Sequence, residues 1–208
     1  MRFIGRKFAD PEVQYDLRHS SMRIIAIHGK PAFQVEYRGE TKYLKPEEII
    51  AMIIARVKEN TEAYLGSQPK GAIFTIPAYF NQSQRQSIRD AAHIAGMDVY
   101  NFFSAPAAAS LDYVFSEVRT GQQNVLFVDV GAGTVSVMLS TIEQEIGEGI
   151  IEVQATAGDL HLGGEDFDIR IMNRMIQRFK RKTGHDITVS ARKAHLEIDS
   201  LYSDINFH

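Results

Sequence analysis

The chain has 208 residues, of which 44% are hydrophobic and 24% are charged, a composition typical of a globular protein that buries a sizeable core. Its net charge of −3 gives no reason to expect a nucleic acid or an anionic membrane as partner, and the lack of cysteine excludes disulfides, thiolate chemistry and cysteine-bound zinc. No apolar run is long enough to span a membrane, and no signal-peptide pattern opens the chain. We therefore expect a cytoplasmic protein.

The first half of the chain alternates strand and helix signals. Three β-type runs are separated by turn residues, at 24–27, 32–37 and 41–44. A helix is predicted from Pro46, which suits a first helical turn, to Gly66, which suits a helix end. A strand at 71–76 comes next, and Ser83 with Gln86 forms the predicted capping box of the following helix.

The middle of the chain again has a strand followed by a helix, and then a polar stretch. A strand is predicted at 99–103, followed by a helix that begins at residues 104–106 and reaches about Phe115. The polar stretch 119–123 is interpreted as a linker between two halves of the protein.

A hairpin turn is the first candidate site. Residues 125–130 are almost entirely apolar, as expected of a buried strand, and the period-2 alternation at 135–140 indicates a second strand. The turn between them reads Gly131-Ala132-Gly133-Thr134. Its glycines let backbone N–H groups approach an anion, its threonine adds a hydroxyl donor, and Asp129 is a carboxylate suited to a hydrated Mg²⁺. The alternative is an ordinary hairpin turn with an aspartate nearby.

A second glycine-rich segment opens the last long helix. After a third apolar run at 150–157, Gly163 and Gly164 stand where the unpaired N–H groups of a helix N-terminus bind anions. The alternative is a helix start favoured by Glu165 and the aspartates after it, with no ligand. An apolar stripe runs along this helix and is expected to be core: Phe167, Ile171, Met175 and Phe179.

Four segments together resemble a known family. GAGT, AGDLHLGGEDFD, IPAYFNQSQRQ and IGRKFADPEVQ are similar to motifs of the heat-shock protein 70 chaperone family, from Met1 to about Thr183 and again at 196–202. The resemblance implies an α/β protein with the actin-like ATPase fold, in which two ribonuclease-H-like lobes enclose Mg-ATP. It also implies descent from ATP-dependent protein-folding chaperones of the stress response. We expect both lobes to be incomplete in this chain.

By the same resemblance the chain divides into four parts. Residues 1–45 are the partial upper part of the first lobe, and residues 46–122 are the core of that lobe. Residues 123–162 are the second-lobe β-hairpin sheet with its phosphate loop, and residues 163–208 are the partial upper part of the second lobe.

The resemblance also gives roles to individual residues. The hairpin turn matches the family's second phosphate loop, with an alanine in place of one glycine, and the second glycine-rich segment matches another nucleotide contact. The implied nucleotide-binding residues are Asp129, Gly131, Ala132, Gly133, Thr134, Gly163, Gly164 and Glu165. Asp129 is the expected Mg²⁺ ligand, through water. Pro77 and Arg85 match a proline–arginine relay that couples nucleotide state to the peptide-binding domain.

Other positions depart from the family pattern. Met1 stands where the family has a lysine that orients the attacking water, Ala105 replaces a glutamate and Ser136 replaces an aspartate. Residues 188–195 stand where the family has a long basic helix that contacts adenosine, and the chain ends at His208, before the peptide-binding domain. Because phosphoryl transfer needs positioned donors and carboxylate-held metal, we expect Mg-ATP or Mg-ADP to bind weakly or not at all, and ATP hydrolysis to be ineffective.

Two functional hypotheses follow. The first is a non-catalytic nucleotide-binding-domain fragment that acts as a decoy or scaffold, with chaperone cofactors bound to its first-lobe surface. The alternative is a functional ATP-binding or ATPase module of a chaperone whose missing segments lie outside this chain. An incomplete first lobe is expected to expose a strand edge near 71–76 or 99–103, which favours self-association.

Overall fold

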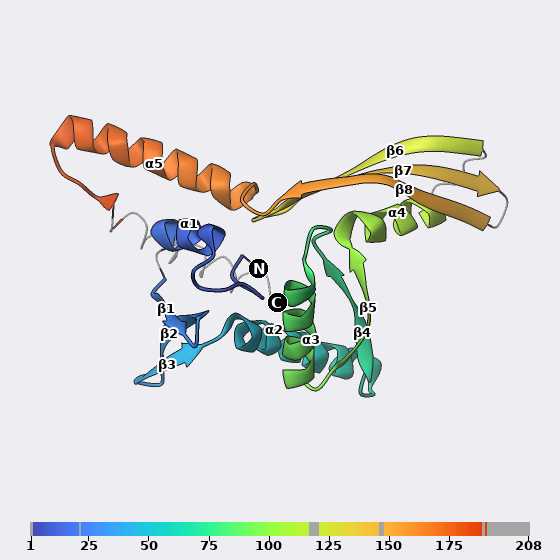
Figure 1. Cartoon of the computed structure of the whole chain (residues 1–208), viewed down its shortest axis with the longest axis horizontal. Helices are drawn as coiled ribbons and strands as arrows, with labels where there is room; N and C mark the ends of the chain where they lie inside the picture. Colours follow the sequence, from blue (N-terminus) through green and yellow to red (C-terminus); the bar gives the residue numbers. More distant parts are fainter. Residues whose placement is uncertain (1, 21, 117–120, 146–147, 189, 191–208) are drawn as a thin grey trace.

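The computed structural model describes residues 2–20, 22–116, 121–145, 148–188 and 190. In this part of the chain the helices are α1 (Pro11–His19), α2 (Pro46–Leu65), α3 (Gln82–Ile94), α4 (Ala105–Ser116) and α5 (Gly164–Thr183). The strands are β1 (Ile24–Ile27), β2 (Lys30–Tyr37), β3 (Glu40–Leu44), β4 (Gly71–Ile76), β5 (Asp98–Ser104), β6 (Gly121–Val130), β7 (Val135–Glu145) and β8 (Glu148–Asp159). Figure 1 shows the curved β6–β8 sheet and α5 pointing away from each other, above a body that contains α2, α3, β4 and β5.

The described strands form three separate sheets. β1, β2 and β3 make one antiparallel sheet, and β6, β7 and β8 make another. β4 and β5 pair in parallel, because α3 carries the chain back between them. Within the described residues each strand of this pair has one edge without a strand partner, as expected from the sequence.

The core of the body lies between α2, α3 and the β4–β5 pair. Small and aliphatic side chains let the two helices approach each other there: Ala51, Ile54, Ala91, Ala92 and Met97. A second cluster joins this body to the N-terminal segment through Ile4, Ile76, Phe80 and Ile88. Burying an isoleucine side chain stabilises a fold by about 1.5–3 kcal/mol, so the fully buried Ile4 anchors the N-terminal segment and positions the residues beside it.

The β6–β8 sheet has one face covered by α4. There Tyr113 meets Phe127 edge to face, with 5.8 Å between ring centroids. Alternate side chains of the central strand point to this face, so Met138 is 1% exposed and Ile142 is 3% exposed. The period-2 pattern predicted for β7 is therefore confirmed.

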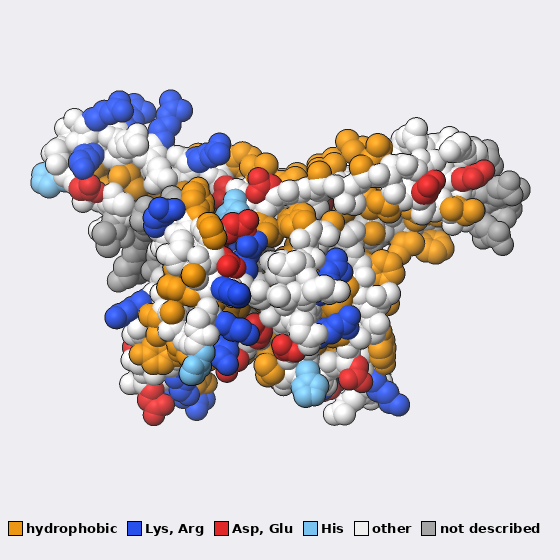
Figure 2. Space-filling model, in the orientation of Figure 1, with side chains coloured by type: hydrophobic (Ala, Val, Ile, Leu, Met, Phe, Trp, Pro, Cys, Tyr) orange, Lys and Arg blue, Asp and Glu red, His pale blue; other side chains and the backbone are white. Residues whose placement is uncertain are grey.

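The opposite face of the same sheet is open. Its β6 side chains Leu126, Val128 and Val130 are 60%, 57% and 60% exposed, and Figure 2 shows hydrophobic side chains along this sheet. The prediction of a buried strand at 125–130 is therefore wrong. The apolar residues do form a strand, but only alternate residues face α4.

Local signals were correct for most element ends. α2 ends at Gly66, which has the left-handed φ of +65°. The predicted Ser83–Gln86 capping box is wrong, because the box that caps α3 begins two residues earlier. The Asn81 side chain accepts from the Gln84 N–H at 2.9 Å, and the Gln84 side chain accepts from the Asn81 N–H at 3.1 Å.

Three other regions differ from expectation. α1 forms where no element was predicted. Residues 121–123 belong to β6 and not to a linker, while 119 and 120 lie outside the described residues. The stripe of α5 that was expected to be core is exposed to solvent.

Candidate functional site

The two glycine-rich segments lie against each other. The Gly131 N–H donates to the Thr134 carbonyl at 2.9 Å and closes the hairpin turn. At the start of α5, the Gly164 N–H donates to the Gly131 carbonyl at 3.1 Å, and the Glu165 N–H donates to the Ala132 carbonyl at 2.7 Å. The structure therefore brings together segments that are about thirty residues apart in the sequence.

Gly163 makes this close approach feasible. A Cβ there would lie 2.7 Å from the Gly133 nitrogen and closer still to the Ala132 carbonyl oxygen. At Gly164 the nearest atom to an added Cβ is the Ala132 Cα, at 3.8 Å, which is an ordinary contact. The two neighbouring glycines thus have different structural requirements.

The backbone contacts decide which donors are left for an anion. α5 uses the N–H groups of Gly164 and Glu165 on the turn, so these two are not available to a ligand. Among the described residues, the N–H groups of Ala132 and Gly133 have no hydrogen-bond partner. They are the backbone donors that the turn offers, and the Thr134 hydroxyl beside them is shared with Tyr79.

Tyr79 crosses from the loop between β4 and α3 to this turn. Its hydroxyl donates to the Asp159 carbonyl at 3.2 Å, and its ring lies directly against Gly158. Burial raises the pKa of Tyr79 from 10.0, the Asp159 and Asp129 carboxylates act in the same direction, and hydrogen bonds with Ser136 and Thr134 oppose them. Tyr79 is thus a protonated donor at neutral pH, close to the turn and to Asp129.

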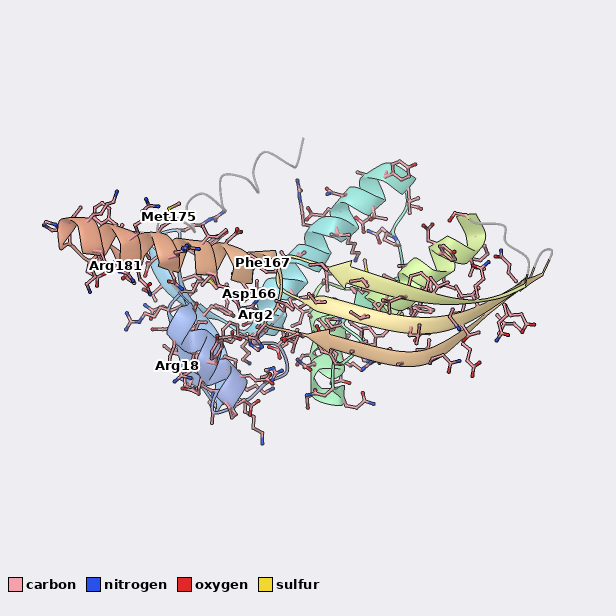
Figure 3. All side chains as sticks on the ribbon, turned by 90° about the horizontal axis from the view of Figure 1, so that it is seen from above. Arg2, Arg18, Asp166, Phe167, Met175 and Arg181 are labelled. Carbon is pink, nitrogen blue, oxygen red and sulfur yellow. The ribbon has the colours of Figure 1, made fainter. Side chains whose placement is uncertain are left out.

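Arg2 is a site residue that the sequence did not reveal. Its guanidinium donates to the Asp166 carboxylate at 2.8 Å and to the Gly133 carbonyl at 3.3 Å. It also lies 3.8 Å from a carboxylate oxygen of the buried Asp16 in α1, which in turn lies 3.2 Å from the His161 Nε2. Figure 3 shows Arg2 and Asp166 side by side where the N-terminal segment meets the start of α5.

A cleft of about 360 Å³ opens beside this ion pair. Its described lining residues are Arg2, Phe3, Asp16, Ser20, Met22, Phe33, Gly133, Thr134, Glu165 and Ile169. Arg2 is the one basic residue among them, whereas two carboxylates line the same cleft. The cleft is therefore polar on the side of the turn and net negative in charge.

The remaining predicted site residues lie around the same loop. The Arg85 side chain donates to the Phe80 carbonyl at 3.0 Å, and the Phe80 N–H donates to the Pro77 carbonyl at 3.1 Å. Both relay residues therefore hold the loop that carries Tyr79, and their coupling role stays a prediction. Within the described residues, no three acidic, histidine or cysteine side chains come together as a metal site. Asp129 as a water-mediated Mg²⁺ ligand likewise stays a prediction.

The comparisons with known proteins decide the family. A family model described as Hsp70 protein matches residues 1–199. The chain belongs to the Hsp70 family. Together with the mixed helices and sheets, this match confirms the expected fold class, a partial actin-like ATPase fold.

Named relatives agree with this family. The heat shock 70 kDa protein of Neurospora crassa is 47% identical over the whole chain, which covers 34% of that relative. The putative heat shock 70 kDa protein 7 of Homo sapiens is 41% identical over the whole chain and 61% of its own length. The heat shock 70 kDa protein BIP3 of Oryza sativa is 47% identical over 92% of the chain and 28% of its own length.

The lengths of these alignments carry a further fact. The chain spans about a third of the length of the first fungal relatives. The Neurospora alignment is 227 residues long and this chain has 208, so the relative carries internal residues that this chain lacks.

No described helix is both long and apolar enough to cross a membrane.

Proposed function

We propose that this chain is a nucleotide-binding-domain fragment of an Hsp70-type chaperone that binds Mg-ADP or Mg-ATP weakly and hydrolyses ATP poorly. The observation that carries this proposal is the charge of the cleft beside the hairpin turn. Arg2, the one basic residue in the described lining, is already paired with Asp166 at 2.8 Å. A polyphosphate in this cleft would meet an arginine whose positive charge is already neutralised by the Asp166 carboxylate, so the attraction between them is weak.

The donor count supports weak binding. Two N–H groups at the start of α5 are used by the turn, which leaves the N–H groups of Ala132 and Gly133, with the Thr134 hydroxyl shared between a ligand and Tyr79. Each lost hydrogen bond to a charged group forfeits roughly 1.5–3 kcal/mol. Mg²⁺ lowers the net charge of the ligand, so we expect nucleotide to bind only as its magnesium complex.

The substituted positions support poor hydrolysis. Ser136 is 2% exposed and lies opposite Asp129 in the β6–β7 pair, where the family resemblance calls for a second carboxylate. Ala105, the first residue of α4, likewise carries no carboxylate. Removing one group that stabilises transition-state charge commonly costs about 10²–10³-fold in rate, although losses within one site are not additive.

Calorimetric titration with Mg-ADP tests the binding. Thr134→Val should abolish the residual heat. The matched control Thr141→Val, which changes a threonine of β7 bonded to Asn124 of the neighbouring β6, should leave it unchanged. A submicromolar dissociation constant for the unchanged chain would refute weak binding. Phosphate release that disappears in Asp129→Ala would refute poor hydrolysis, and it would favour a working ATPase module.

A further inference from the structure

α5 carries an apolar stripe that no described residue covers. Phe167, Ile171, Met175 and Phe179 follow one another at intervals of four and are 49%, 58%, 68% and 41% exposed. The other side of the helix is packed, since Ile176 is 6% exposed. α5 thus has two apolar sides, of which one faces the protein and the other faces solvent.

A basic stripe runs beside the apolar one. Arg170, Arg174, Arg178 and Lys182 repeat with the same interval and are all exposed. Lys180 has a partner, because its ammonium lies 2.8 Å from the Asp186 carboxylate. Within the described part of the chain, Arg174, Arg178 and Lys182 have no carboxylate partner. Figure 2 shows Lys and Arg side chains gathered over α5.

The two stripes meet in one hollow of about 550 Å³. We call it the α5 groove, and its described lining consists of Ile171, Arg174, Met175, Arg178, Phe179 and Lys182. Half of these side chains are apolar and half are cationic. A ligand that satisfies both needs apolar groups and negative charges at matching intervals.

We propose that the α5 groove binds an acidic, amphipathic helical segment of a partner protein. A helix with apolar and acidic side chains each repeating every fourth residue presents the complementary pattern, and desolvated cation–carboxylate pairs across the contact supply orientation. A second copy of this chain is a poor occupant of the groove if it binds through its own α5 groove. A two-fold contact between two α5 grooves places arginines opposite arginines, and like charges in contact cost several kcal/mol.

An anionic membrane is the other chemistry that a basic amphipathic helix attracts. The chain as a whole carries a net charge of −3, which opposes its approach to an anionic lipid surface, so we favour a polypeptide. The groove and the cleft beside Arg2 share no lining residue, so we expect the peptide to bind in the absence of nucleotide.

The direct test uses a designed probe. A labelled eighteen-residue helical peptide with leucine and glutamate each at every fourth position is titrated with the purified chain, followed by fluorescence anisotropy. The double variant Arg174→Glu, Arg178→Glu should weaken binding by about tenfold or more, and a peptide with lysine in place of glutamate should restore it. Lys70→Glu, at an exposed lysine just before β4, is the matched control and should bind like the unchanged chain.

Other occupants are excluded by companion measurements. Met175 should oxidise rapidly with dilute peroxide, whereas Met138, at 1% exposure, should be protected. Slow oxidation of Met175 means that the chain covers its own groove and overturns the proposal. Three other results would also overturn the proposal. They are flotation with phosphatidylserine vesicles that the double variant abolishes, dimerisation that the double variant abolishes, and failure of the lysine peptide to restore binding to the double variant.

Discussion

The neighbouring glycines at the start of α5 permit a sharp test of the site geometry. In Gly163→Ala, the new Cβ would lie 2.7 Å from the Gly133 nitrogen, against backbone that has no free rotation to relieve the overlap. The turn and the helix start must separate, and the bonds from Gly164 to Gly131 and from Glu165 to Ala132 weaken or break.

The expected loss follows from those two bonds. A backbone hydrogen bond contributes about 0.5–1.5 kcal/mol, so Gly163→Ala should lower the free energy of unfolding by about 1–3 kcal/mol. For a chain of this size each kcal/mol corresponds to roughly 2–4 °C in melting temperature. Gly164→Ala is the matched control, because its Cβ meets nothing closer than 3.8 Å and alanine favours the helix.

Urea unfolding and amide hydrogen exchange measure the two consequences. Gly163→Ala should lower the unfolding midpoint and speed exchange at the Glu165 amide, and Gly164→Ala should change neither by more than a small amount. Equal losses in both variants, or unchanged exchange at Glu165 in Gly163→Ala, would show that the turn and α5 are not held together as described.

Two further predictions concern Tyr79 and the open sheet edge. Because burial raises the pKa of Tyr79 in the folded state, the stability linked to its protonated hydroxyl is complete below pH 10.0 and is lost as pH rises through the folded pKa. Tyr79→Phe should remove this alkaline loss in unfolding curves recorded from about pH 8 to pH 11, and an identical pH profile in both proteins counts against the contact. Ile73→Lys, at a 57% exposed position of β4, should reduce self-association in sedimentation velocity. A monodisperse monomer of the unchanged chain at high concentration would remove the basis for that expectation.

Local signals predicted the elements better than they predicted burial. Gly66 ends α2 because a left-handed residue stops a helix wherever it occurs, so its effect is readable from sequence. The prediction of a strand at 125–130 was correct. Which of its side chains are buried depends on where α4 packs, and no local sequence pattern contains that information. The α3 cap failed for another reason, since Asn81-x-x-Gln84 and Ser83-x-x-Gln86 are equally good boxes in sequence.

The candidate site shows the same limit. The turn at 131–134 and the glycines at 163 and 164 were recognisable as separate patterns, and their meeting is a tertiary fact. The sequence does not predict Arg2 as a site residue, because a single arginine near a chain end forms no recognisable local pattern. Its role comes from Ile4, whose burial places the neighbouring segment between α1 and α5.

The open face of the β6–β8 sheet has a consequence for the life of this protein in a cell. Leu126, Val128 and Val130 offer the kind of surface that folding helpers and degradation enzymes recognise on immature chains. A folded molecule that displays such a surface resembles an immature chain in this respect, so we expect its steady-state level to depend on how quickly it is captured or degraded as well as on its synthesis.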